Sequence, residues 1–420
     1  MIFYRLFIWI YPKLVWLISF SNPKAGLWIS GRRDVFKKLA KAFHQNTRPV
    51  IWIHTASVGE FEQGRPVLES IKKQFPAYKV LLTFFSPSGY ELRKDYRGAD
   101  EIFYLPMDSP DNARSFYTIV QPSLVIFVKY EYWFYYLREA KKREIPLLLV
   151  SGIFRRNQPF FQWYGGMHKK MLSFFSYLFV QNRESAALLE KLGLQQVAIT
   201  GDTRFDRVIE IAENFQPIDL IENFCNKQFC IVAGSTWTED DEELDHFANT
   251  HSEIRFIIAP HEIEKERIDE CRQLYKNALL FSELRSYVNG GIPIPSNMHV
   301  LIIDNVGMLS SLYAYANISY VGGGFGDDGI HNILEPAVFG KPVIIGPVYD
   351  KYFEASELIE MGGAFSIETA LELESLLNDL MTDSSRLDAA SESSKAYVRS
   401  KAGATAAILQ YIQENRLLTN

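Results

Sequence analysis

Four short segments of the sequence carry side chains suited to group-transfer chemistry. Each segment follows a run of apolar residues and precedes a helical pattern, so its polar groups lie where a strand ends and a helix begins. Such junctions favour ligand binding, because free backbone N–H groups and the positive end of the helix dipole attract an anion. The segments are His54–Phe61, Ile258–Glu262, Asp304–Leu309, and the glycine-rich Val321–Phe325 with Gly329–Ala337.

The first segment contains Glu60, three residues after Ser57 and behind the small residues of an A-S-V-G-E run. A carboxylate at this junction can accept the proton of an attacking hydroxyl group, so Glu60 is a candidate general base. The alternative is a first-turn glutamate that only stabilises its own helix. His54 taken alone is typical of a hydrogen-bonded histidine at a strand end rather than of a base.

The glycine-rich segment predicts a nucleotide site. Its glycines let the backbone approach a ligand closely, and Asn332 can cap the helix that Pro336 would enter in its first turn. Glu335, one turn into that helix, has the carboxylate needed to take the two hydroxyls of a ribose. The alternative is a capping box without a ligand.

The two remaining segments belong to the same half of the chain. By the rule for open sheets, loops at the carboxyl ends of neighbouring strands line one crevice. Pro260 and His261 would flank a base there, and the backbone of Val306, Gly307 and Met308 would read its edge. Each of these loops, taken singly, is also an ordinary connection.

The elements that position these segments indicate an α/β fold. With 420 residues, 47% of them hydrophobic, two domains are expected. Short apolar runs alternate with helical patterns, such as Glu62–Gln74 and Arg183–Leu192, as in doubly wound parallel sheets. The expected strands are Val50–His54, Lys79–Phe84, Glu101–Leu105, Leu124–Val128, Pro146–Val150, Tyr177–Val180, Val197–Thr200, Phe229–Ala233, Arg255–Ala259, Val300–Ile303, Ile318–Val321 and Pro342–Ile345.

We expect residues 1–30 to form a membrane-anchor segment, residues 31–213 one Rossmann-like domain and residues 214–420 a second one. The two domains would leave a cleft between them. The last helix of the chain is free to pack back on the first domain.

Residues 1–50 are both basic and apolar. They carry nine lysines and arginines against one acid, and Arg5 and Lys13 are the only charges from Ile2 to Phe20. No uninterrupted apolar run or small-residue cleavage site of a secretory signal is present. The segment would either span a bilayer, where Lys13 beside Pro12 is costly, or lie in the membrane interface with its aromatic residues at headgroup level. A buried N-terminal helix is the alternative.

The cysteines and acidic residues indicate which disulfide and metal sites the sequence excludes. Three cysteines without a C-x-x-C pair cannot form a disulfide framework or a zinc knuckle, and they fit a reducing compartment. The sequence has no D-x-D motif and no set of ligands at metal-binding spacing, so we expect metal-independent chemistry without a cofactor. The acidic run Glu239–Glu243 is typical of a helix start.

Several motifs together resemble the Kdo transferase family, which transfers 3-deoxy-D-manno-octulosonic acid to lipid A precursors. The resemblance runs from the N-terminal segment to about Ala364, and its motifs are A-S-V-G-E at Ala56–Glu60, S-P-S-G at Ser86–Gly89, G-D-T-R-F-D at Gly201–Asp206, and V-G-G-G-F…H-N-I-L-E-P-A-V-F-G-K-P-V with its closing G-P. It implies a GT-B fold, a CMP-Kdo donor, a lipid IVA-type acceptor, inversion at the anomeric carbon, and attachment to the cytoplasmic side of the bacterial inner membrane. We expect no nucleic-acid partner.

The resemblance also implies roles for single residues. Glu60 matches the proton acceptor of the family, and Arg204 matches a lysine that stabilises the transition state. The CMP-contacting stretches of the family match the residues Pro260, His261, Val306, Gly307, Met308, Asn332, Ile333, Leu334 and Glu335.

The sequence departs from the family in three motifs. The family's E-T-E-x-W becomes Lys129-Tyr130-Glu131-Tyr132-Trp133, so Lys129 stands where the family has a glutamate that stabilises the transition state. Either Lys129 or Glu131 would fill that role. The family's N-A-R-L-S becomes S-G-I-F-R at Ser151–Arg155, and its G-G-H-N becomes G-I-H-N at Gly329–Asn332. The acceptor side is therefore less well matched than the donor side.

Two other functions fit the same pattern. Another two-domain sugar-nucleotide enzyme, such as a UDP-sugar epimerase or a different lipid glycosyltransferase, would share the architecture and the ribose-binding carboxylate. A membrane-tethered protein that binds a nucleotide without catalysis is the second alternative.

Overall fold

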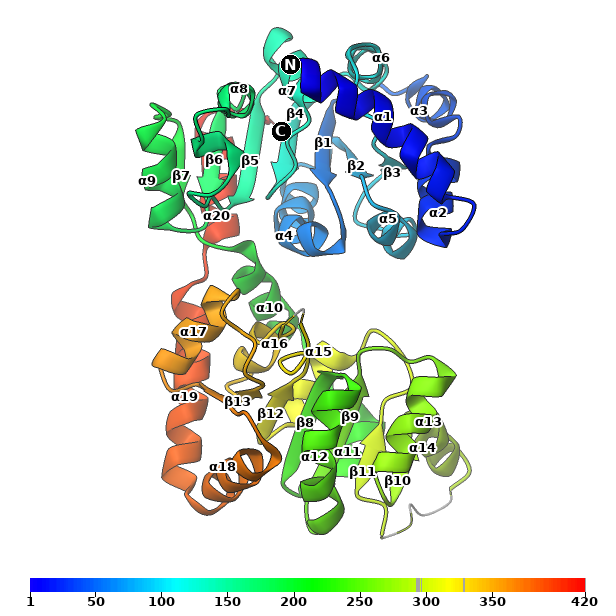
Figure 1. Ribbon diagram of the computed structural model, residues 1–420, viewed down its shortest axis with the longest axis vertical. Coiled ribbons are helices and arrows are strands. Elements are labelled where there is room, and N and C mark those ends of the chain that lie inside the picture. Colours follow the sequence, from blue (N-terminus) through cyan, green and yellow to red (C-terminus); the bar gives the residue numbers. More distant parts are fainter. Residues whose placement is uncertain (292–294, 296, 328, 420) are drawn as a thin grey trace. The chain divides into compact units, whose positions relative to one another are not determined.

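The computed structural model describes residues 1–291, 295, 297–327 and 329–419 (Figure 1). It divides into two compact units. Unit 1 comprises residues 1–207 and 402–420, and unit 2 comprises residues 208–401. The sequence had suggested a boundary after residue 213. The structural boundary instead lies inside helix α10 (Thr203–Glu213).

In the described part of unit 1, seven parallel strands form one sheet in the order β3-β2-β1-β4-β5-β6-β7. Both faces are covered by helices, which explains why the strands read as continuous apolar runs rather than as alternating ones. The strands are β1 (Val50–Thr55), β2 (Lys79–Phe84), β3 (Glu101–Tyr104), β4 (Pro122–Val128), β5 (Leu147–Gly152), β6 (Tyr177–Val180) and β7 (Val197–Ile199).

Alternate residues of each strand enter two different cores. Trp52 of β1 packs with residues of α3, α6 and α7 on one face, whereas Ile51 and Ile53 pack with α4 and α20 on the other. The helices of unit 1 are α1 (Ile2–Ile18), α2 (Pro23–Arg32), α3 (Val35–Phe43), α4 (Val58–Gln74), α5 (Pro87–Arg93), α6 (Pro110–Val120), α7 (Phe134–Lys142), α8 (Gly166–Leu172), α9 (Arg183–Lys191) and α20 (Ala404–Glu414), with a 3-10 turn at Pro159–Phe161.

The last helix of the chain belongs to unit 1. Ile408 and Ile412 of α20 are fully buried in the core that α4 covers. Asp206, the final residue of the G-D-T-R-F-D motif, accepts hydrogen bonds from the backbone N–H groups of Gly403 and Thr405, each at 2.6 Å. This carboxylate therefore caps the N-terminus of α20, because the first N–H groups of a helix have no partner inside it.

Replacing Asp206 with alanine is expected to lower the free energy of unfolding by about 1–2 kcal/mol, the usual cost of losing an N-cap. The same change should increase protease cleavage near residue 402, because α20 would detach more often. Thermal unfolding and limited proteolysis measure the two effects. Asp111→Ala, at an exposed first-turn aspartate of α6, is the control. Equal behaviour of the two variants would contradict the capping role.

Unit 2 repeats the architecture. Within its described residues, seven parallel strands are ordered β10-β11-β9-β8-β12-β13-β14. The strands are β8 (Cys230–Thr236), β9 (Arg255–Pro260), β10 (Ala278–Leu280), β11 (Val300–Ile302), β12 (Ile318–Val321), β13 (Val343–Ile345) and β14 (Ala364–Ser366). The helices are α11 (Asp219–Cys225), α12 (Thr238–Thr250), α13 (Lys265–Leu274), α14 (Phe281–Asn289), α15 (Leu309–Leu312), α16 (Leu334–Ala337), α17 (Phe353–Glu360), α18 (Ala370–Thr382) and α19 (Ser384–Ser400), with a 3-10 turn at Tyr313–Tyr315.

The predicted alternation of strands and helices is confirmed, with strand ends shifted by at most a few residues. Two strands were not predicted, β10 and β14, and both are three residues long at the edges of the second sheet. Edge strands pair on one side only, so a short stretch with a weak apolar pattern suffices. The structure therefore supports the predicted fold class of two parallel-sheet α/β units.

Helix α1 lies on unit 1 next to α2 (Figure 1). The Tyr4 hydroxyl donates a hydrogen bond to Asp108, and the same carboxylate accepts the N–H groups of Tyr135 and Tyr136 at the start of α7. The Tyr11 ring packs edge-on against Trp28 at 5.6 Å. One side of α1 is thus attached to the globular body by specific contacts, although none of its residues is fully buried.

The other side of α1 is apolar and exposed. Its large exposed hydrophobic residues, with the following turn, are Ile2, Phe3, Leu6, Phe7, Trp9, Leu14, Trp16, Leu17, Ile18 and Phe20. Among the described residues, no helix combines the length and the apolar character needed to cross a membrane.

Candidate functional site

Each sheet has a topological switch point, where the strand order reverses and where ligands bind in open α/β sheets. In unit 1 this point lies between β1 and β4, and in unit 2 it lies between β8 and β12. Glu60 follows β1, and Lys129 and Glu131 follow β4. In unit 2 the glycine-rich segment follows β12, so the predicted residues of both units cluster around switch points.

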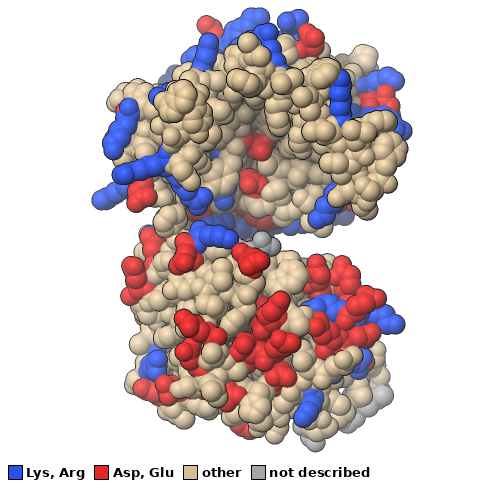
Figure 2. Space-filling view, in the orientation of Figure 1, with Lys and Arg blue, Asp and Glu red and all other residues tan. Residues whose placement is uncertain are grey.

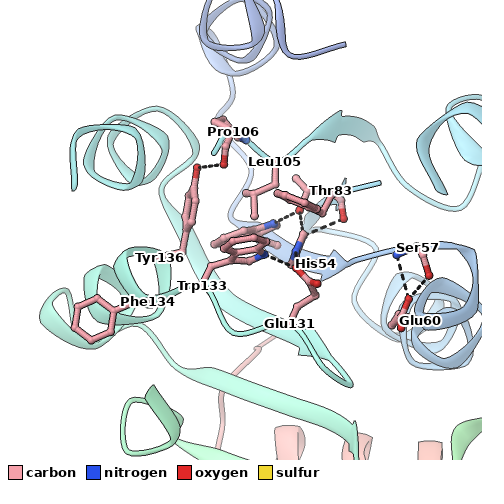
Figure 3. A network of polar contacts seen from close by, with 12 residues as sticks. His54, Ser57, Glu60, Thr83, Leu105, Pro106, Glu131, Trp133, Phe134 and Tyr136 are labelled. Atoms are coloured by element: carbon pink, nitrogen blue, oxygen red, sulfur yellow. Dashed lines mark hydrogen bonds and ion pairs between the residues drawn. The ribbon is translucent and has the colours of Figure 1, made fainter. Parts of the chain in front are cut away.

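Glu60 lies in the first turn of α4 and forms a capping box with Ser57. Its Oε2 accepts a hydrogen bond from the Ser57 N–H at 3.1 Å and a second from the Ser57 hydroxyl (Figure 3). These contacts are those of a helix-stabilising glutamate, the alternative weighed from the sequence. They leave Oε1 without a hydrogen bond in the described structure, and the side chain is only half-buried. The cap therefore orients the carboxylate and keeps one oxygen available to a substrate.

Arg204 is fixed by the aspartate that precedes it in the G-D-T-R-F-D motif. Its Nε donates to Asp202 Oδ2 at 2.8 Å, and its backbone N–H donates to Asp202 Oδ1 at 2.9 Å. Asp202 is 6% exposed and also accepts from Gln63 of α4 at 3.3 Å. Because α4 also carries Glu60, one helix positions both the candidate base and the anchor of the candidate cation.

The structure brings Glu60 and Arg204 into one neighbourhood around Tyr130. Burial raises the pKa of the Tyr130 phenol, the charges of Arg155 and Arg204 lower it, and those of Glu60 and Asp202 raise it. Neither Tyr130 nor Arg155 was predicted from the sequence. The signal that could have found them is their position in the two motifs that depart from the family.

Lys129 belongs to the same neighbourhood. It adopts a left-handed backbone conformation with φ +61° directly after β4, and its Nζ lies 5.1 Å from the centre of the Tyr130 ring. A non-glycine residue in this region is unusual and costs free energy, which is typical of functional turns. The predicted catalytic residues Glu60, Arg204 and Lys129 therefore lie together in unit 1.

In unit 2 the structure joins two of the predicted nucleotide-binding runs. Glu335 accepts a hydrogen bond from Ser310 of α15 at 2.8 Å and another from the Asn332 amide at 3.1 Å. Ser310 lies two residues after Met308, so this contact holds the loop of Val306–Met308 against the run Asn332–Glu335. Asn332 also accepts from the Leu334 N–H at 3.2 Å, but the N-cap of the four-residue helix α16 is Ile333, so the predicted capping role of Asn332 is wrong and its side chain instead holds the turn before the helix.

Not every residue of these runs can offer its side chain to a ligand. Ile333 and Leu334 are 1% and 0% exposed and pack in the core, so only their backbone groups are available. Val306 is 79% exposed, and Gly307 adopts φ +94°, which suits a glycine.

The third predicted nucleotide-binding run, Pro260 and His261, contacts the glycine-rich segment through three stacked rings. His261, exposed beside the buried Pro260, stacks on Trp237 at 4.6 Å and on His331 at 4.4 Å between ring centres. The Trp237 indole donates a hydrogen bond to His331 Nε2 at 3.3 Å. Trp237 was missed by the sequence reasoning, which had only its place between β8 and α12 as a signal.

Asp240, from the acidic run, has a larger role than starting a helix. It lies in the first turn of α12 as predicted, but it is 1% exposed and accepts hydrogen bonds from Gly323 N at 2.8 Å, Trp237 N at 2.9 Å and the Tyr320 hydroxyl at 2.7 Å. Burial raises the pKa of this carboxyl group. A Cβ atom on Gly322 would collide with the Ser235 carbonyl, so the glycine allows the loop to reach Asp240.

Across residues 1–291, 295, 297–327 and 329–419, no group of three or more His, Cys, Asp or Glu side chains is arranged to hold a metal ion.

The family model and the relatives in sequence that match this chain carry the same name. Residues 32–207 match the family described as 3-Deoxy-D-manno-octulosonic-acid transferase (kdotransferase). The 3-deoxy-D-manno-octulosonic acid transferase of Aquifex aeolicus (strain VF5) is 28% identical over 347 residues, which cover 80% of this chain and 88% of that protein. The enzyme of the same name from Haemophilus influenzae (strain ATCC 51907 / DSM 11121 / KW20 / Rd) is 29% identical over 347 residues, covering 78% of this chain and 79% of that protein.

A solved structure shares the fold. UDP-GlcNAc 2-epimerase from Neisseria meningitidis, crystallised with UDP-GlcNAc, superimposes with a TM-score of 0.62 over 87% of this chain and 100% of that chain, at 14% identity. At that identity the likeness describes the architecture and not the substrate. The family match and the relatives in sequence carry the assignment: the chain is a glycosyltransferase whose residues 32–207 match the 3-deoxy-D-manno-octulosonic acid (Kdo) transferase family and which is similar over most of its length to enzymes of that name.

Proposed function

We propose that this protein transfers Kdo from CMP-Kdo to a lipid IVA-type acceptor with inversion at the anomeric carbon, using the GT-B arrangement expected from the sequence. The observation that carries the proposal is the grouping of Glu60, Arg204 and Lys129 around Tyr130 at the switch point of unit 1. A carboxylate beside fixed cations is what transfer of a sugar from a phosphate leaving group requires.

In the proposed reaction, a hydroxyl of the acceptor gives its proton to Glu60 Oε1 while its oxygen bonds to the anomeric carbon of Kdo. The bond from that carbon to the CMP phosphate oxygen breaks, and the electron pair leaves with the phosphate. Arg204, held by Asp202, would stabilise the developing negative charge, and its planar guanidinium suits two phosphate oxygens. Lys129 would add a second positive charge near the Kdo carboxylate or the phosphate.

The donor would bind to unit 2. Glu335 would accept the two ribose hydroxyls, and the loops that contain Pro260, His261 and Val306–Met308 would contact the cytosine. No cofactor or metal is part of this proposal.

The decisive experiment incubates purified protein with CMP-Kdo and a tetraacylated acceptor and counts the added sugars by mass spectrometry. An increase by whole Kdo units, unaffected by EDTA, supports the proposal. Titration with CMP and UDP separates the main alternative, since a preference for UDP would contradict Kdo transfer and favour another sugar-nucleotide enzyme.

The anchoring of Gly323 by Asp240 gives a prediction for donor binding. Asp240→Ala should raise the Kd for CMP about tenfold or more, because three buried donors lose their acceptor and the glycine-rich loop is released. Asp240→Asn should have a smaller effect, because an amide oxygen can still accept the two N–H groups. Isothermal titration with CMP measures both, with the adjacent exposed Glu239→Ala as control. An unchanged Kd in Asp240→Ala would show that the loop does not contact CMP.

The exposed apolar side of α1 would hold unit 1 on the cytoplasmic side of the inner membrane, in contact with its lipids. The basic residues of the first 50 positions would attract anionic headgroups, and indole rings favour the interface.

Trp9 and Trp16 are 60% and 52% exposed. A double variant in which serine replaces both residues should bind vesicles that contain anionic lipid at least about tenfold more weakly than the wild type. Vesicle co-sedimentation measures this binding, and a higher salt concentration should weaken vesicle binding by the wild-type protein as well. Leu371→Ser, at a 79% exposed leucine of α18, is the control. If both variants sedimented with vesicles as the wild type does, α1 would not be the part of the protein that contacts the membrane.

A further inference from the structure

The switch point of unit 1 contains a second carboxylate, Glu131, that the proposed reaction does not use. It follows β4, and its side chain is 16% exposed and reaches toward the end of β1. Figure 3 shows Glu131 beside His54 and Trp133, while Glu60 lies apart with Ser57. The space-filling view shows a hollow in unit 1 with acidic side chains at its floor (Figure 2).

A chain of hydrogen bonds leads to this carboxylate from the core. The Trp52 indole lies 2.8 Å from Thr83 Oγ1, which lies 2.8 Å from His54 Nδ1, and His54 Nε2 lies 3.3 Å from Glu131 Oε2. An indole N–H can only donate, so Thr83 Oγ1 accepts from Trp52 and must place its own proton on another acceptor. Among the described contacts that acceptor is His54 Nδ1.

This direction fixes the tautomer of His54. If Nδ1 instead donated to the Thr83 carbonyl at 3.1 Å, the buried Thr83 hydroxyl would have no acceptor for its proton. Leaving such a group unsatisfied is costly. Nδ1 therefore accepts, Nε2 carries the hydrogen, and His54 donates to Glu131 as a neutral imidazole.

Glu131 Oε2 receives a second hydrogen bond from the Trp133 indole, whereas Oε1 has no hydrogen bond in the described part of the protein. Two donors therefore fix the position of Oε2. The chain cannot conduct a proton away, because Trp52 is fully buried and only donates. Its effect is to hold one oxygen of Glu131 in place and leave the other available.

The surroundings of Glu131 are aromatic. The rings of Phe85 and Trp133 lie 4.5 Å apart, and Tyr11 lies 6.2 Å from Phe85. Arg32 stacks over Phe85 and donates to the Phe85 carbonyl at 2.7 Å, and Glu131 is one of the groups that favour its charged form. A fixed carboxylate beside partly exposed aromatic faces is suited to a sugar ring, which offers hydroxyl donors at its edge and C–H groups on its faces.

We propose that Glu131 binds the attacking sugar of the acceptor, with Oε1 accepting a ring hydroxyl that is not the nucleophile. In this proposal His54 is a positioning residue that acts through Glu131. Glu60 remains the base, and the inference rests on the proposed function. The ligand class is a hydroxyl-bearing pyranose, as in a glucosamine lipid.

The test measures kcat and the acceptor KM at saturating CMP-Kdo. Glu131→Gln can still accept from His54 and Trp133 but lacks the charge, so its acceptor KM should rise about tenfold to a hundredfold with kcat within about threefold of wild type. Glu62→Gln, at a half-exposed glutamate of α4, should change neither constant. An unchanged KM, or a loss confined to kcat, would overturn the proposal, since the latter result would make Glu131 a base.

The positioning role of His54 needs its own variants. His54→Leu should raise the acceptor KM as Glu131→Gln does, and His54→Gln should restore most of it, because a glutamine amide can donate where Nε2 does. In the Glu131→Gln background, His54→Leu should add little. His54 would have only a structural role if His54→Leu and His54→Gln lowered kcat and the unfolding temperature equally and left the acceptor KM unchanged.

A binding measurement separates this inference from the proposed function. Equilibrium binding of a tetraacylated glucosamine disaccharide, with no donor present, needs no transfer. If wild-type protein fails to transfer Kdo yet binds this lipid about tenfold or more tightly than Glu131→Gln, only the proposed function fails. If it transfers Kdo while both proteins bind the lipid equally, only the sugar subsite fails.

Discussion

Replacing Glu60 with glutamine is expected to lower kcat by about 10²- to 10⁴-fold, the usual contribution of a general base. Glutamine can preserve the capping box, because its amide oxygen accepts the Ser57 N–H as the carboxylate does at 3.1 Å. The substitution therefore removes the proton acceptor and leaves helix α4 intact. Kdo transfer at saturating substrates measures kcat, and titration with CMP should give an unchanged Kd.

The matched control is Glu239→Gln, at an exposed glutamate in the first turn of α12 in unit 2. It should retain full activity. If Glu60→Gln kept kcat within tenfold of the wild-type value, Glu60 would be a capping residue alone. If its unfolding temperature fell, the loss of activity would no longer report on chemistry.

Removing the guanidinium of Arg204 should have the second largest effect. Arg204→Ala is expected to lower kcat by about 10²- to 10³-fold, comparable to the loss of one preorganised donor to a transition-state charge. Arg204→Lys should retain part of the activity, since it keeps the positive charge but not the paired contact with Asp202 at 2.8 Å. The Kd for CMP should change much less than kcat.

Asp202→Asn tests the anchoring of that cation. Its loss of kcat should be smaller than that of Arg204→Ala, because the guanidinium remains present but is less well fixed. Arg183→Ala, at the exposed start of α9, is the control for a general loss of positive charge. A kcat of Arg204→Ala equal to that of the control would exclude a catalytic role for Arg204.

The local elements of this protein were predictable because their signals are local. The apolar runs that became β1, β2 and β6 have the predicted start points, and helix α9 starts at Arg183 as expected. A strand that is buried on both faces must be apolar throughout, whatever its neighbours are. The same reasoning failed for the three-residue edge strands β10 and β14, whose pairing depends on a neighbour and not on their own pattern.

The candidate sites were predictable in part. Glu60 and Glu335 were found because a carboxylate behind a strand and small residues is visible in the sequence. Asp240 was interpreted as an acidic helix start, and nothing local shows that it reaches Gly323, 83 positions further along the chain. Tyr130 and Trp237 were missed for the same reason, since an aromatic residue at a strand end is usually a core residue.

The sequence by itself determined the two α/β units, the loops that contain polar groups at strand ends, and the apolar N-terminal helix, because hydrophobic period and turn chemistry are properties of short stretches. Tertiary structure alone decided which loops meet at each switch point, how α20 returns to unit 1, and how His54 holds Glu131. These depend on strand order and on hydrogen bonds between residues far apart in the chain, and no local pattern specifies either of them.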